Sequence, residues 1–177
     1  MVVFDASILV LLIDPDVAAP LDPATGKPVT RCRERLDYLI ATFERERTRV
    51  LIPTPALSEA LVRADEAGPA ILDALNASAR FRIAPFDTRA AVELAQLTRE
   101  AVDSGDKKQG SSESWAKVKF DRQIVAIART EGACIIYSDD DGIRRFARRL
   151  GIEVIGISAL PVPPDDPQDE LFSFATD

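Results

Sequence analysis

Short apolar runs recur along the chain, separated by segments in which apolar residues return every three or four positions. The runs are Val2–Phe4, Val50–Ile52, Phe81–Ala84, Ala133–Tyr137 and Glu153–Ile155. Runs of this length, bounded by Pro, Gly or Asp, are typical of buried strands. The segments with helical spacing are Ser7–Ile13, Thr30–Arg47, Ala56–Glu66, Pro69–Ser78, Asp87–Val102, Val118–Thr130 and Asp141–Leu150. Strands that alternate with helices predict an α/β fold, with a mostly parallel central sheet of about five strands and helices on both faces.

Polar and proline-rich segments indicate where the loops lie. Asp14–Pro28 contains four prolines, and Asp103–Ser114 is rich in Gly, Ser and Lys, so we expect an exposed loop and a mobile loop or lid. The length of 177 residues fits a single domain. We expect this domain to span residues 1–161 and residues 162–177 to form an acidic, Pro-rich tail.

Composition excludes several classes of enzyme. The chain has no histidine, so it contains no Ser-His-Asp triad, histidine base or His-containing zinc site. The net charge of −7 argues against non-specific adhesion to nucleic acid but allows a nucleic-acid substrate at a local basic patch. Cys32 and Cys134 form neither a disulfide framework nor a zinc motif, and a cytoplasmic location is expected. The apolar run Ile8–Ile13 is too short to span a bilayer, so no membrane association is expected.

Acidic residues follow two of the predicted strands and occur in two of the predicted helices. Asp5 follows the first run, Asp139–Asp141 follow the fourth, Glu59 lies in the helix after Pro55, and Asp121 opens a long helix. The carboxyl ends of parallel strands meet at one edge of the sheet, where ligands bind. Carboxylates gathered there repel each other unless a hard cation lies among them, and Mg²⁺ or Mn²⁺ prefers oxygen ligands. The pattern predicts a metal-dependent phosphoryl-transfer enzyme, specifically a nuclease.

Each of these acids also has a simpler interpretation. Asp5 alone could cap the following helix, and Glu59 alone could be a solvated helix residue. Asp121 alone could interact with the helix dipole, and Asp139–Asp141 could form a cap with a turn. The conjunction of all four positions favours a shared site.

Basic and aromatic residues outside this set have two interpretations each. The residues concerned are Arg144, Arg145, Arg148, Arg149, Lys107, Lys108 and Trp115. The arginines form either an RNA-backbone patch or a solvated helix face that pairs with acids of the tail. The lysines either reach a substrate or belong to an ordinary loop. The tryptophan is either a packing anchor, which we favour, or a platform for base stacking.

Four stretches of sequence together resemble the PIN-domain family, especially VapC-type toxin ribonucleases. They are VVFDASILV (Val2–Val10), TPALSEAL (Thr54–Leu61), FDRQIVAIA (Phe120–Ala128) and IIYSDDDGIRRFA (Ile135–Ala147). The resemblance extends in order and spacing over most of Met1–Pro161. It implies a single PIN-like domain that binds Mg²⁺ or Mn²⁺ and cleaves RNA.

The resemblance also implies roles for individual residues. Asp5, Glu59, Asp121 and Asp140 would be catalytic, and Asp5, Asp121 and Asp140 would bind the metal together with Asp139. Ser7 and Ser138 would orient a carboxylate or a bound water molecule. The family often carries a further Asp where this chain has Gly142. Which of Asp139, Asp140 and Asp141 serves as the fourth ligand therefore stays open.

The resulting hypothesis is a metal-dependent endoribonuclease that could be the toxin of a toxin–antitoxin pair, with an antitoxin partner and a homodimeric state. The alternative is a PIN-like module that binds RNA or protein without cleaving. A phosphoaspartate receiver is disfavoured because Ala159–Pro161 offers no lysine after the last strand. An Asp-x-Asp phosphatase is disfavoured because Ser7 stands where the second Asp would be.

Overall fold

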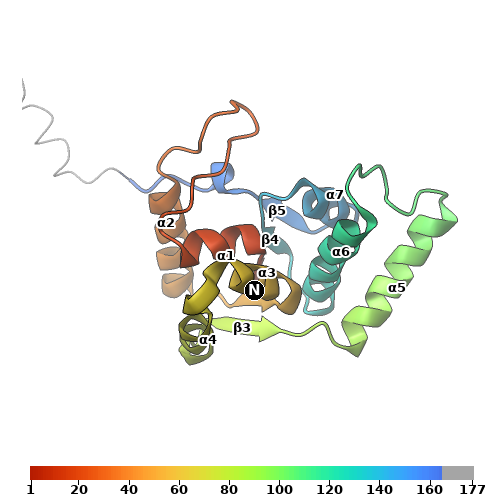
Figure 1. The fold of residues 1–177 in the computed structure, drawn as a ribbon, viewed down its shortest axis with the longest axis horizontal. Coiled ribbons are helices and arrows are strands. Elements are labelled where there is room, and N and C mark those ends of the chain that lie inside the picture. Colours follow the sequence, from red (N-terminus) through yellow and green to blue (C-terminus); the bar gives the residue numbers. More distant parts are fainter. Residues whose placement is uncertain (165–177) are drawn as a thin grey trace, which may run out of the picture.

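The computed structural model describes residues 1–164 as a parallel sheet flanked by helices (Figure 1). The strands are β1 (Val2–Phe4), β2 (Val50–Pro53), β3 (Phe81–Ala84), β4 (Ile135–Tyr137) and β5 (Glu153–Ile155). The helices are α1 (Ala6–Ile13), α2 (Cys32–Glu46), α3 (Thr54–Ala64), α4 (Gly68–Ala77), α5 (Thr88–Asp103), α6 (Trp115–Thr130) and α7 (Asp141–Arg149), with short 3₁₀ turns at Asp65–Ala67 (η1) and Ile157–Ala159 (η2). The α/β class and the parallel sheet are confirmed. The predicted tail largely lies outside the described residues.

The five strands run in the order β3-β2-β1-β4-β5, which places β1 at the centre of the sheet. Val3 pairs with Leu51 on one side and with Ile136 on the other. All residues of β1 and β2 are buried, which explains why both runs are apolar without alternation. Phe4 pairs with Tyr137, so the residues that follow β1 and β4, Asp5 and Ser138, leave the sheet side by side.

The aromatic core lies at the carboxyl end of the central strands. The ring of Phe4 contacts Tyr137 edge-on, with centroids 5.6 Å apart, and Phe43 of α2 contacts the same tyrosine at 5.6 Å. Edge-to-face pairs at this spacing are favourable and hold their partners in one orientation. The strand ends that carry Asp5 and Ser138 are therefore anchored in rigid packing.

Two helix starts differ from the predictions. Thr30 does not cap α2, which begins at Cys32 after Arg31 in a left-handed conformation and without a side-chain cap. Helix α6 begins at Trp115 rather than Val118, because the Ser114 hydroxyl accepts the backbone N–H of Lys117 at 3.2 Å. Asp121 consequently lies inside the helix and does not open it, so the interpretation as a helix-dipole partner is wrong.

The region after α3 also differs from the prediction. Helix α3 ends at Ala64 rather than at Glu66, η1 follows it, and α4 begins at Gly68 rather than at Pro69. Proline is tolerated in a first helical turn, where its missing N–H has no partner to lose. No helix among residues 1–164 is long and apolar enough to cross a membrane.

Candidate functional site

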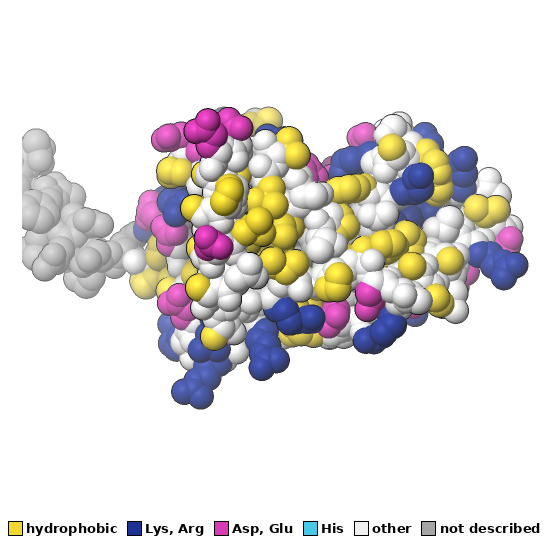
Figure 2. Space-filling model, turned by 60° about the horizontal axis from the view of Figure 1, so that its bottom comes forward, with side chains coloured by type: hydrophobic (Ala, Val, Ile, Leu, Met, Phe, Trp, Pro, Cys, Tyr) yellow, Lys and Arg dark blue, Asp and Glu magenta, His cyan; other side chains and the backbone are white. Residues whose placement is uncertain are grey.

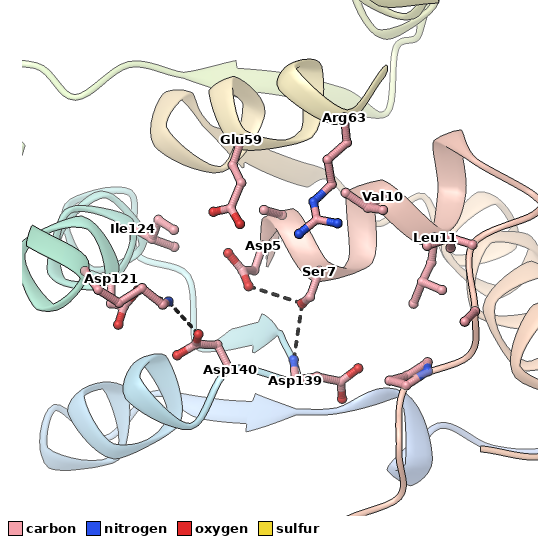
Figure 3. A pocket seen from close by; sticks show the side chains of 15 residues that line it. Asp5, Ser7, Val10, Leu11, Glu59, Arg63, Asp121, Ile124, Asp139 and Asp140 are labelled. Atoms are coloured by element: carbon pink, nitrogen blue, oxygen red, sulfur yellow. Dashed lines mark hydrogen bonds and ion pairs between the residues drawn. The ribbon is translucent and has the colours of Figure 1, made fainter. Parts of the chain in front are cut away.

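A cavity of about 300 Å³ opens at the carboxyl edge of the central strands (Figure 3). The acidic residues that line it are Asp5, Glu59, Asp121, Asp139 and Asp140. They come from the end of β1, from α3, from α6 and from the connection between β4 and α7. All four of the acids predicted to be catalytic thus meet at one cavity, although they are far apart in the sequence.

Asp5 is the most constrained of these acids. Its side chain makes no capping hydrogen bond to α1, so the interpretation as a side-chain cap is wrong. Its Oδ2 instead accepts hydrogen bonds from the hydroxyls of Ser138 at 2.8 Å and Ser7 at 3.1 Å. The residue is only 4% exposed. Burial raises the pKa of Asp5, and the hydrogen bond from Ser138 offsets this shift only in part.

The same two hydroxyls tie Asp5 to the loop after β4. Ser7 Oγ accepts the backbone N–H of Asp139 at 3.3 Å, and Ser138 Oγ accepts the backbone N–H of Asp140 at 3.0 Å. Each serine therefore donates to the Asp5 carboxylate and accepts from the opposite strand end. A polar network that is satisfied in this way holds its members in one geometry.

Asp140 divides its two carboxylate oxygens between two partners. Oδ1 accepts the backbone N–H of Ile143 at 2.9 Å and so caps α7, while Oδ2 accepts from Lys117 Nζ at 2.6 Å. Burial acts to raise the pKa of Asp140, but the hydrogen bonds from Lys117 and Ile143 outweigh it, and the pKa is lowered. The cap interpretation is correct for Asp140 and leaves its second oxygen facing the cavity.

Lys117 is a site residue that the sequence analysis did not identify. Its Nζ lies 2.6 Å from Asp121 Oδ1 and 2.6 Å from Asp140 Oδ2, so one ammonium joins the two acids. Burial acts to lower the pKa of Lys117, yet the two carboxylates together raise it above its usual value. The signal was present in the sequence, because Lys117 stands four residues before Asp121 on the same helix.

Asp121 is 3% exposed and has a pKa well above its usual range. Burial raises the pKa of Asp121 to about 6, with the negative charges of Asp140 and Asp5 acting in the same direction and Lys117 opposing them. A carboxyl group with this pKa exchanges its proton close to neutral pH, which is typical of functional sites.

The side chains of Asp139 and Asp141, which flank Asp140 in the sequence, do not face the other acids. Asp139 Oδ1 accepts the N–H of Ile157 at 2.9 Å, and Figure 3 shows its carboxylate turned away from Asp5 and Asp140. Its Oδ2 is buried without a hydrogen-bond partner among the described residues, and burial raises the pKa of Asp139. The Asp141 side chain is 86% exposed and lies 3.7 Å from Arg144. Of the three aspartates, Asp140 is the one that faces the other acids.

Gly142 occupies a position where the resembling family often has an acid, and the geometry accounts for the difference. A Cβ atom there would lie 2.4 Å from Asp121 Oδ2 and 2.9 Å from Asp140 Oδ1. Any side chain at this position would collide with the acid pair. The close approach of Asp121 and Asp140 therefore requires glycine.

The α3 side of the cavity is less constrained. Glu59 is exposed, and Figure 3 shows its carboxylate directed toward Asp5. Arg63, one turn further along α3, extends its guanidinium into the same cavity. Arg63 and Lys117 are the two basic lining residues, and the sequence analysis singled out neither.

The carboxylate oxygens of this cavity are possible ligands for a divalent cation. Within residues 1–164, no three acidic or cysteine side chains lie close enough together to hold one metal ion as they stand. The Asp121–Asp140 pair nevertheless already holds a cation, the ammonium of Lys117, between two carboxylate oxygens. Oxygen donors without histidine or cysteine suit Mg²⁺ or Mn²⁺ better than zinc. The residues that could hold such an ion are Asp121 and Asp140, with Asp5 beside them.

Comparisons with known proteins rest on structure alone. No protein-family model matches the chain, and no curated protein matches its sequence. Among solved structures, VapBC2 from Rickettsia felis bound to a promoter DNA fragment has a TM-score of 0.57 at 14% identity, covering 88% of this chain and 98% of that one.

Two further structures give the same result. DNA-bound VapBC from Salmonella typhimurium has a TM-score of 0.55 at 17% identity, covering 88% of this chain and 97% of that one. Mycobacterium tuberculosis VapC20, a toxin that cleaves the sarcin–ricin loop, has a TM-score of 0.52 at 14% identity, covering 84% and 95%. At these identities the likeness concerns the fold, and the chain has the PIN-domain fold of VapC proteins.

Proposed function

We propose that this protein is a Mg²⁺- or Mn²⁺-dependent endoribonuclease that cleaves phosphodiester bonds at the cavity lined by Asp5, Glu59, Asp121 and Asp140. The observation that carries the proposal is the meeting of these four acids at one cavity, where two of them already share a cation. The PIN-domain fold supports the same reaction class, as does the cleavage of the sarcin–ricin loop by one structural neighbour, VapC20.

A bound divalent cation would supply water activation and would neutralise charge that develops on the phosphodiester. In this proposal Asp121 and Asp140 would hold the cation, and the Lys117 ammonium, which lies between them in the structure, would contact the phosphate. Ser7 and Ser138 keep the Asp5 carboxylate in a fixed orientation beside this pair. Glu59 approaches from α3 and completes the acidic lining.

The proposal extends to partners. Two structural neighbours are VapBC assemblies, which supports an antitoxin as partner of this chain as well. Such a partner would present Arg or Lys toward Asp5 and Asp140, because the cavity is acidic. We also propose a homodimer, for which molecular mass in solution is the test.

The alternative function is a PIN-like module that binds RNA or protein without cleaving. One observation favours it: the ammonium of Lys117 already satisfies Asp121 and Asp140, so the fold does not depend on a metal there. Cleavage of a mixed RNA pool in Mg²⁺ or Mn²⁺, with EDTA and the Asp5→Asn variant as controls, separates the two functions. Cleavage that persists in EDTA or in the variant contradicts the metal-dependent nuclease, and absence of both cleavage and metal binding assigns the binding module.

A further inference from the structure

We propose that a basic groove along α7 continues the acidic cavity and binds the sugar-phosphate backbone of single-stranded RNA on its way to or from the cleavage site. The inference rests on the proposed ribonuclease function and adds the path of the substrate. Four arginines define this basic groove: Arg144, Arg145, Arg148 and Arg149.

Helix α7 begins inside the candidate site. Asp140, which faces the acid pair, is also the N-cap of α7. The helix buries Ile143, Phe146 and Ala147 against the domain. Four of the other six positions are the arginines, which lie at spacings of one and four residues and share the outer side of the helix with Asp141. The basic side of α7 therefore extends away from the acids along the helix axis.

Three hollows connect the acids to the arginines. The acidic cavity shares Asp121 with a narrow hollow of about 20 Å³ that is also lined by Lys108, Arg122 and Arg145. That hollow shares Arg145 with the basic groove, which has a volume of about 590 Å³. Neighbouring hollows thus share a wall residue, which places the basic groove beside the acids on the surface of the molecule.

Most of the positive charge on α7 has no ion-pair partner within residues 1–164. Among residues 1–164, Arg145, Arg148 and Arg149 form no ion pair, and only Arg144 has one, with Asp141 at 3.7 Å. The molecule carries a net charge of −7, so this concentration is not a result of overall composition. Figure 2 shows Lys and Arg side chains near the loop between α5 and α6, at the upper right of the view, and others along the lower edge.

Arg122 gives a second, independent indication of an anionic ligand. It is 1% exposed and lies between the rings of Trp115 and Phe146, at 5.4 Å and 4.9 Å from their centroids. One amino group donates to the Lys107 carbonyl at 2.6 Å, but Nε and Nη1 are buried without hydrogen-bond partners among the described residues. A buried cation without an anion is unfavourable, so an oxygen in the narrow hollow would stabilise it.

RNA fits this path better than an acidic peptide does. Guanidinium groups bind phosphate through two parallel hydrogen bonds, and a row of arginines suits a repeating phosphate backbone. The lining of the basic groove contains no aromatic residue, so it contacts backbone rather than stacked bases and adds little sequence preference.

The test measures RNA affinity separately from cleavage. Fluorescence anisotropy of a labelled single-stranded RNA is recorded with the full chain carrying Asp5→Asn, with and without Arg145→Gln/Arg148→Gln, across a salt series. Arg45→Gln/Arg49→Gln, a pair of exposed arginines that line none of the three hollows, removes the same charge as the control. Thermal melting confirms that both double variants fold.

We expect Arg145→Gln/Arg148→Gln, the α7 variant, to weaken RNA binding about tenfold. The slope of log affinity against log salt concentration should fall by about 1.4, since each phosphate contact to a single strand contributes about 0.7. The control should change affinity less than about twofold, as expected for charges outside the binding path. Equal affinities for the two variants, in a protein that binds and cleaves RNA, overturn the groove and leave the nuclease intact. Labelled polyglutamate is measured in the same assay. If the α7 substitutions abolish its binding and leave RNA binding unchanged, the groove belongs to an acidic partner and the proposal is overturned. A parent protein that neither binds nor cleaves RNA overturns the proposed function itself.

Discussion

The side of the cavity at the ends of β1 and β4 (the strand side) differs from the side formed by α3 and α6 (the helix side) in how its acids are held. On the strand side, Asp5 is held by two serine hydroxyls that are themselves bonded to the neighbouring strand end. On the helix side, Asp121 depends on the long side chain of Lys117, and Glu59 is exposed. Short hydroxyl side chains such as those of Ser7, near the start of α1, and Ser138, directly after β4, lose little entropy when they are ordered, whereas a lysine side chain has several rotatable bonds. Asp5, Ser7 and Ser138 thus form a rigid half of the cavity that fixes the Asp5 carboxylate. Asp121, Lys117 and Glu59 form an adjustable half that can admit a cation and substrate.

The largest effect is expected from removing the charge on the strand side. Asp5→Asn should lower Mg²⁺-dependent cleavage by at least ~10²-fold, since even residues that only support metal ligands contribute 10–100-fold. Its stability without metal should be unchanged or slightly higher at neutral pH, because burial already disfavours the ionised carboxylate. Cleavage assays and denaturant melts measure both quantities. A large loss of stability without metal would show that the Asp5 charge is structural.

Substitutions of Ser138 and Ser7 should change the orientation of the Asp5 carboxylate without changing the charge of the site. Ser138→Ala removes the hydrogen bond of 2.8 Å to Asp5 and leaves the Asp140 N–H without its acceptor, so we expect roughly a 10–100-fold loss of activity. Ser7→Ala removes the longer bond of 3.1 Å and serves as the matched variant with a smaller loss. Equal and negligible losses would contradict the rigid-half interpretation.

The adjustable half should respond to pH. Protonated Asp121 cannot bind a cation, so Mn²⁺ affinity should rise by up to about tenfold per pH unit below the pKa of about 6 and level off above it. Without metal, the folded pKa exceeds the unfolded one, so the folded state binds more protons and stability should fall as pH rises from about 4 to 6. Asp121→Asn should flatten both profiles, which calorimetry and melting curves measure. An unchanged affinity profile in this variant would place the titration elsewhere.

The smallest effect concerns the ammonium between the two acids. Lys117→Met keeps the length of the side chain but removes the competing cation, so Mg²⁺ should bind several-fold more tightly in calorimetry, a change of about 1 kcal/mol as expected for a partly exposed charge near carboxylates. Cleavage should fall in the same variant if Lys117 offers its charge to the phosphate. Weaker metal binding would instead show that Lys117 positions the acids. Lys119→Met, on the same helix and outside the cavity lining, is the control.

Some features of this protein were determined by the sequence alone. Apolar runs and helical spacing predicted the strands and most helices, because burial on both faces of a parallel sheet requires apolar side chains throughout. Asp5, Asp140 and the intervening serines were predictable as neighbours, since residues after parallel strands share one edge of the sheet. The N-cap of α6 was missed because the polar residues Lys117 and Lys119 interrupt the apolar spacing in its first turns.

Tertiary structure alone decided the inner geometry of the site. No local pattern predicts that Lys117 also contacts Asp140, which lies 23 positions further along the chain. Nor does one predict that the close approach of Asp121 and Asp140 excludes a side chain at Gly142. The same holds for the direction of Asp139, whose carboxylate turns to the N–H of Ile157 because that donor arrives from the segment after β5. Sequence spacing describes neighbours within an element, whereas contacts between elements depend on how the sheet and helices pack, which only the folded chain specifies.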